Sequence, residues 1–155
     1  MMHFESVRYL DVYQELEKLA RIHHGEVGAV GLSFNVDHGK LVREDRAGAL
    51  VTVVAKEGVN KLIGYAIFVV QTSLQDRTAL VASETAFFLH PDARRGRNAL
   101  RFVQAAERIV SKHGIRKIVY HIDMRNDFSR LMHFLGYRDV ERVVCKDMTG
   151  DEQCQ

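Results

Sequence analysis

The stretch from Glu84 to Arg101 constrains the fold of this chain more than any other. It begins with an apolar run, TAFFL, typical of a buried strand that ends at the tripeptide HPD at residues 90–92. A short turn with three arginines and one glycine follows, and then the clearest helical pattern of the sequence, at residues 97–112. The first turn of a helix presents N–H groups without intrahelical partners, the helix dipole is positive there, and arginine adds charged donors. The stretch therefore predicts an anion site between a strand and a helix.

Length and composition predict one globular domain over residues 1–150, with a frayed tail at 151–155. The chain has 155 residues, of which 46% are hydrophobic, and its net charge of +2 does not by itself indicate a nucleic acid or a membrane as partner. The N-terminus has no apolar signal core, and no apolar run approaches the ~20 residues of a membrane span. We therefore expect a cytoplasmic protein with no membrane partner. No His/Cys/Asp grouping has a zinc-like spacing, so we predict no metal.

The hydrophobic periodicity predicts both strands and helices. The basic turn lies between a strand and a helix that leads to another strand, so the strands on either side should run parallel through a right-handed crossover. Gly64, inside an apolar run, predicts a bulge or a close backbone approach, and we expect a second irregularity near Glu84. We expect strands at residues 3–9, 50–55, 62–70, 78–90, 116–122 and 141–148, and helices at 11–24 (capped by Asp11), 41–46, 97–112 and 127–135. The result is an α/β domain with a mixed sheet.

Three phosphate ligands suit a basic turn between a strand and a helix. A dinucleotide is disfavoured because the GxGxxG fingerprint is absent and Gly96 stands alone. A nucleoside triphosphate is disfavoured because no Gly-Lys-Ser/Thr ending is present. The third ligand is the pyrophosphate of coenzyme A, and the order of the surrounding elements decides in its favour.

Over roughly residues 49–148, the order of elements and three motifs resemble the GNAT family of N-acetyltransferases. The run FFLHPDARRGRNAL at residues 87–100 resembles the family's aromatic–Val/Leu–HPEYRGKGIG segment. The segment from Asn126 to LMHFLGY at 131–137 resembles its Asn…Phe-Tyr-x-x-Leu-Gly-Phe segment, and VVCKDM at 143–148 resembles its closing strand. The form RRGRNA is most similar to short members from phage and bacterial genomes.

The resemblance implies a fold and a reaction. The fold would be a mixed, mostly antiparallel central sheet with a parallel splayed strand pair, flanked by helices. The reaction would be direct transfer of an acetyl group from acetyl-CoA, as co-substrate, to a primary amine.

The resemblance also implies residues that bind acetyl-CoA. Arg94 takes the place of the leading basic residue of the family's pyrophosphate loop, and Ala99 takes the place of its last small residue. Backbone N–H groups would hold the pyrophosphate, main-chain groups of the preceding strand would pair with the pantetheine arm, and an asparagine would contact the far end of that arm. The N–H groups of the loop would come from Arg95, Gly96, Arg97, Asn98 and Ala99. The main-chain groups of the strand would come from Phe88, Leu89 and His90. The asparagine at the far end of the arm would be Asn126.

Two positions depart from the family pattern. Arg97 stands where the loop usually has its second glycine, and a residue with a side chain tolerates a positive φ poorly. Met132 stands where many members have a tyrosine that protonates the leaving thiolate, and methionine cannot donate a proton.

Three residues are candidates for the general base, because an amine must lose a proton before it can attack a thioester. The first is Glu84, on the strand next to the expected bulge, where partial burial would raise the pKa of the carboxyl group. His121 and Asp123, at the end of the parallel strand, are the next candidates. A backbone N–H near Leu89 would meet the oxyanion of the tetrahedral intermediate.

Two other interpretations stay open at this point. One is a non-catalytic GNAT-like protein that binds coenzyme A, which Met132 supports. The other is a nucleic-acid-binding module that uses Arg94, Arg95, Arg97 and Arg101.

The sequence does not identify the acceptor amine, which could belong to a protein, a small molecule or a nucleic acid. The segment at residues 25–48 is expected to shape the pocket for this acceptor. A homodimer is the expected form if the chain self-associates.

Overall fold

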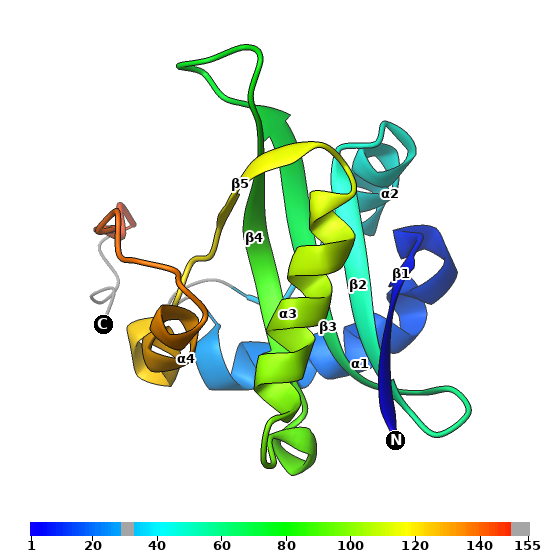
Figure 1. Cartoon of the computed structure of the whole chain (residues 1–155). Helices are drawn as coiled ribbons and strands as arrows, with labels where there is room; N and C mark the ends of the chain where they lie inside the picture. Colours follow the sequence, from blue (N-terminus) through cyan, green and yellow to red (C-terminus); the bar gives the residue numbers. More distant parts are fainter. Residues whose placement is uncertain (29–32, 150–155) are drawn as a thin grey trace. The chain divides into compact units, whose positions relative to one another are not determined.

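The computed structural model describes residues 1–28 and 33–149. The described part consists of strands and helices joined mostly by short loops (Figure 1). In chain order these are β1 (Met2–Val7), α1 (Tyr9–Val27), α2 (His38–Arg46), β2 (Leu50–Glu57), β3 (Lys61–Thr72), β4 (Leu80–Leu89), the 3₁₀ turn η1 (Pro91–Ala93), α3 (Asn98–Ser111), β5 (Ile115–Val119), the 3₁₀ turn η2 (Met124–Asn126) and α4 (Ser129–Phe134).

The strands form one five-stranded sheet in the order β1-β2-β3-β4-β5. Neighbouring strands from β1 to β4 are antiparallel, whereas β4 and β5 are parallel and are joined through α3. The predicted mixed sheet and parallel strand pair are therefore confirmed.

Side chains that alternate along the strands build a core on each face of the sheet. Val53 packs in the cluster that contains Phe102 of α3, whereas its neighbour Val54 packs in the cluster that contains Leu16 of α1. Figure 1 shows α3 crossing one face of the sheet. Since both faces are covered, the central strands read as continuous apolar runs rather than as alternating ones.

Close contacts divide the chain into two compact units. The first comprises Met1–Ala20 and Asp37–His121, and so contains the sheet, α2, α3 and the first part of α1. The second comprises the described residues of Arg21–Val36 and of Ile122–Gln155. The single domain over residues 1–150 stays a prediction, and the predicted tail at 151–155 lies outside the described residues.

Both predicted irregularities of the sheet are present. Gly64 lies so close to β4 that a Cβ added to it would come within 2.7 Å of the carbonyl oxygen of Phe88, so a glycine is required there. Between β3 and β4 the register passes from Ile67–Ala86 to Phe68–Glu84, which leaves Thr85 as the extra residue of a bulge.

Two sequence-based expectations are wrong. Residues 141–148 do not form a strand: among the described residues they have no strand partner, and Val143 and Val144 are exposed. β-Propensity alone does not hold a strand without a paired neighbour. The first helix begins at Tyr9 rather than after Asp11, whose carboxylate instead pairs with Arg8, and it continues past Gly25 to Val27.

No helix within residues 1–28 and 33–149 is long and apolar enough to cross a lipid bilayer.

Candidate active site

The parallel pair β4–β5 separates part of the way along β4. The last paired residues are Ser83 and Val119, whereas β4 continues for six residues to Leu89. The bulge at Thr85 follows directly, and a bulge bends the strand that carries it. Because β5 ends at Val119, the parallel strand pairing along β4 stops just before Glu84.

Glu84 and His121 bridge the two chain segments where the strands diverge. The backbone N–H of His121 donates to Oε2 of Glu84 at 3.1 Å, and Nδ1 of His121 lies 2.8 Å from the carbonyl oxygen of Glu84. Each residue thus uses its side chain to bond the main chain of the other. We call this pair the Glu84–His121 clasp. The clasp takes the place of the next pair of hydrogen bonds between the two segments. It places the side chains of Glu84 and His121 where the strand pairing ends.

The Glu84 carboxyl group is buried, with 4% of the residue exposed. Burial disfavours the charged form and raises the pKa of Glu84 to about 7, and the hydrogen bond from the His121 amide opposes that rise only in part. A carboxyl group with such a pKa can both accept and release a proton near neutral pH. His121, by contrast, is exposed.

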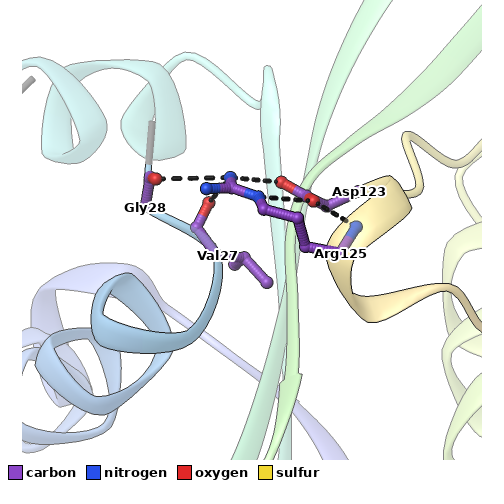
Figure 2. Close-up of polar contacts among 4 residues, drawn as sticks. All are labelled: Val27, Gly28, Asp123 and Arg125. Carbon is purple, nitrogen blue, oxygen red and sulfur yellow. Dashed lines mark hydrogen bonds and ion pairs between the residues drawn. The ribbon is translucent and has the colours of Figure 1, made fainter. Parts of the chain in front are cut away.

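Asp123, the third candidate base, belongs to the second unit and is engaged by Arg125 (Figure 2). The Arg125 guanidinium donates to Asp123 at 3.0 and 2.7 Å, and this hydrogen bonding holds the pKa of Asp123 below its usual value. The same guanidinium also donates to the carbonyl oxygens of Val27 and Gly28 at 2.8 and 3.3 Å. Asp123 is therefore a poor proton acceptor, and its contacts indicate a structural role.

The basic turn after β4 is held by its first arginine. Nε of Arg94 donates to the carbonyl oxygen of Leu89 at 2.7 Å, and its guanidinium carbon lies 5.4 Å from the centre of the Phe88 ring. The Asn98 side chain donates to the carbonyl oxygen of Ala93 at 3.0 Å. These contacts fix the turn between β4 and α3.

The conformation of this turn resolves the question that Arg97 raised. Gly96 takes the left-handed conformation, with φ of +56°, whereas Arg97 has φ of −99° and is unstrained. The glycine simply stands one place earlier than in the family pattern. Arg97 is the N-cap of α3 and makes no side-chain cap bond. The N–H of Asn98 donates to the carbonyl oxygen of Arg95 at 3.1 Å, so a ligand can take the other N–H groups of the first turn. Arg95, Gly96 and Arg97 are all exposed, which suits a pyrophosphate ligand.

The strand leading to this turn presents alternate main-chain groups to its two edges. The N–H of His90 donates to the carbonyl oxygen of Ile63 at 2.7 Å and is therefore used within the sheet. By the alternation of an antiparallel pair, Phe88 also points its main-chain groups at β3, whereas Phe87 and Leu89 point theirs away from β3. Leu89 is thus better placed than Phe88 or His90 to pair with an extended ligand.

The two remaining residues that the sequence singled out lie in the second unit. The N–H of Asn126 donates to the carbonyl oxygen of Asp123 at 3.0 Å within η2, and its side chain is exposed. Met132 is 2% exposed on α4, where it packs as a core residue.

A family model, the acetyltransferase (GNAT) family, matches residues 12–137 of the chain. The chain belongs to the GNAT family. GNAT enzymes use acetyl-CoA, so the donor inferred from the sequence is supported. A search of curated proteins finds no match.

Solved structures of GNAT acetyltransferases share this fold. A predicted acetyltransferase from Clostridium acetobutylicum, crystallised with acetyl-CoA, has a TM-score of 0.69 and 17% identity over 99% of this chain and 100% of that one. An acetyltransferase from Trypanosoma brucei has a TM-score of 0.68 and 18% identity, over 96% and 100%. An aminoglycoside acetyltransferase from an uncultured soil metagenome has a TM-score of 0.69 and 14% identity, over 94% and 93%.

Sequence reasoning named both members of the clasp but missed two groups that shape the surroundings. One is Arg125, for which the close spacing to Asp123 was an available signal. The other is the carbonyl oxygen of Ile63, which takes the His90 amide and which only the register of the sheet could show.

Proposed function

We propose that this GNAT protein transfers an acetyl group from acetyl-CoA directly to a primary amine, with Glu84 as the general base. The observation that supports this most is the buried Glu84 carboxyl group at the point where β4 and β5 diverge. Its pKa of about 7 suits the removal of a proton from an ammonium group at neutral pH.

The turn between β4 and α3 is the proposed binding site for coenzyme A. The N–H groups from Arg95 to Ala99, apart from that of Asn98, would hold the pyrophosphate, with Gly96 in the conformation that this turn requires. Leu89 would pair its main chain with the pantetheine arm, and its N–H would meet the oxyanion of the tetrahedral intermediate. Arg94 would keep the turn in place, because its Nε is bonded to the carbonyl oxygen of Leu89.

The test is release of the coenzyme A thiol from acetyl-CoA in the presence of primary amines. The panel would contain a polyamine, a lysine peptide, a peptide with a free N-terminus and an aminoglycoside, the last because one structural neighbour is an aminoglycoside acetyltransferase. Glu84→Gln should lower kcat by about a hundredfold or more. Glu57→Gln, which changes an exposed glutamate at the end of β2, should leave it unchanged.

A coenzyme A-binding protein without turnover is the second candidate, and the buried Met132 favours it because the usual proton donor is missing. The same assay separates the two. A protein that binds acetyl-CoA but releases no thiol with any amine of the panel would contradict the enzymatic proposal.

A further inference from the structure

The imidazole of His121 is fixed in one tautomer by its hydrogen bond. Nδ1 lies 2.8 Å from the carbonyl oxygen of Glu84, and a carbonyl oxygen can only accept. Nδ1 must therefore carry the hydrogen. In the neutral ring, Nε2 then carries a lone pair and no hydrogen. His121 is exposed, so its ring can be reached from solvent beside Glu84, where the β4–β5 pairing has ended.

The proposed reaction requires a second proton carrier besides Glu84. An ammonium group has three hydrogens, and the amide product keeps one, so two protons leave the nitrogen. The N–C bond forms, the C–S bond breaks with its electron pair on sulfur, one proton ends on that sulfur and the other goes to water. Glu84 accounts for one of these transfers. Met132 stands at the family's usual donor position and cannot make the other.

We propose that His121 is the group that protonates the departing thiolate, through Nε2. Nε2 takes a proton from the nitrogen of the tetrahedral intermediate and gives it to sulfur as the C–S bond breaks. This inference rests on the proposed function. The clasp holds His121 for this role, since its backbone N–H and its Nδ1 are both bonded to Glu84.

A structural role for His121 is the main rival explanation, and a conservative variant separates the two. His121→Asn keeps an amide hydrogen where Nδ1–H lies, so it can still donate to the Glu84 carbonyl, but it has no counterpart of the Nε2 lone pair. A residue needed only for position would tolerate this change, whereas a proton carrier would not. His113→Asn is a matched control, because Nδ1 of the exposed His113 likewise lies 3.2 Å from a backbone carbonyl oxygen, that of Ile109.

Hydroxylamine as the acceptor isolates the proton transfer to sulfur. It is already neutral at mildly alkaline pH, so it needs no base before it attacks, yet the thiolate still needs a proton. With hydroxylamine, His121→Asn should lower kcat about a hundredfold, while His113→Asn should stay near the wild-type rate. Both His121→Asn and wild type should bind acetyl-CoA equally, measured by its effect on Tm.

Nitrogen NMR of the imidazole groups gives a readout that does not depend on turnover. The neutral His121 ring should show a hydrogen on Nδ1 and a bare Nε2, with its signals assigned by their loss in His121→Asn. A hydrogen on Nε2, or full activity of His121→Asn with hydroxylamine, would overturn the inference while leaving the proposed function intact. A wild-type protein that binds acetyl-CoA and releases no thiol would instead overturn the proposed function, and this role with it.

Discussion

At the scale of single residues, Glu84 should make the stability of the protein depend on pH. Its pKa is about 7 in the folded protein, against an ordinary value of 4.5, because the folded state buries it. The folded state therefore holds this proton more tightly than the unfolded state. The stabilisation is complete below pH 4.5 and is lost as the pH rises through the folded pKa near 7.

The free energy of unfolding should accordingly fall by about 3 kcal/mol between those two pH values through Glu84 alone. Denaturant titrations at a series of pH values measure this fall. Glu84→Gln cannot ionise and should flatten the profile, whereas Glu57→Gln should keep it. A Glu84→Gln profile as steep as that of the wild type would show that Glu84 titrates normally.

The rate should depend on pH in the opposite direction. A general base works only when it is deprotonated, so kcat/KM should rise with pH through an apparent pKa near 7 and then level off. The pH dependence of thiol release at low amine concentration measures this rise. The rise of kcat/KM near pH 7 should disappear in Glu84→Gln. If the Glu84→Gln variant keeps this rise, a different group is the base.

Gly96 should matter for ligand binding as well as for folding. A side chain at its φ of +56° costs roughly 1–2 kcal/mol, although an added Cβ would meet no atom within 4 Å. Gly96→Ala should therefore raise the Kd for acetyl-CoA about tenfold, measured by calorimetry. Gly114→Ala imposes the same kind of strain, at φ of +73° and also in open space, after the far end of α3. It should lose similar stability and keep the wild-type Kd.

At the scale of elements, the sequence predicted best where a segment makes its own structure. The amphipathic pattern of α3 and the apolar runs of β2, β3 and β4 placed these elements within a few residues. The segment at 141–148 failed because a strand depends on a partner that no local pattern reveals. The clasp was only half predicted: Glu84 and His121 were candidates on separate strands, but their reciprocal bonding depends on where the parallel pairing ends.

Arg125 should tie the end of α1 to η2 within the second unit, as Figure 2 shows. Its guanidinium bonds the carbonyl oxygens of Val27 and Gly28, and hydrogen bonds from a basic side chain to the last carbonyl groups of a helix stabilise that end. Arg125→Gln should therefore speed amide hydrogen exchange in the last turn of α1 about tenfold. Arg130→Gln, an exposed change on α4, should not. Equal exchange in both variants would mean that the contact stabilises nothing.

At the scale of the whole molecule, acetyl-CoA should stabilise the folded state. A ligand at one hundred times its Kd adds about 2.7 kcal/mol, which for a chain of this length raises Tm by roughly 5–10 °C. Thermal unfolding with and without acetyl-CoA measures the shift. Acetylpantetheine lacks the pyrophosphate and should shift Tm far less at the same concentration, because the turn from Arg95 to Ala99 is proposed to hold that group.

The turn variants extend this prediction and distinguish coenzyme A from nucleic acid as its ligand. Arg94→Gln loses the bond to the Leu89 carbonyl and should reduce the shift caused by acetyl-CoA, whereas Arg116→Gln, an exposed change on β5, should not. A nucleic-acid site would behave differently: single-stranded and duplex oligonucleotides would shift Tm, and the shift would fall steeply with added salt. A shift with oligonucleotides and none with acetyl-CoA would reassign the arginine cluster. A shift with acetyl-CoA that survives Arg94→Gln in full would show that the turn binds the pyrophosphate without the bond from Arg94 to Leu89.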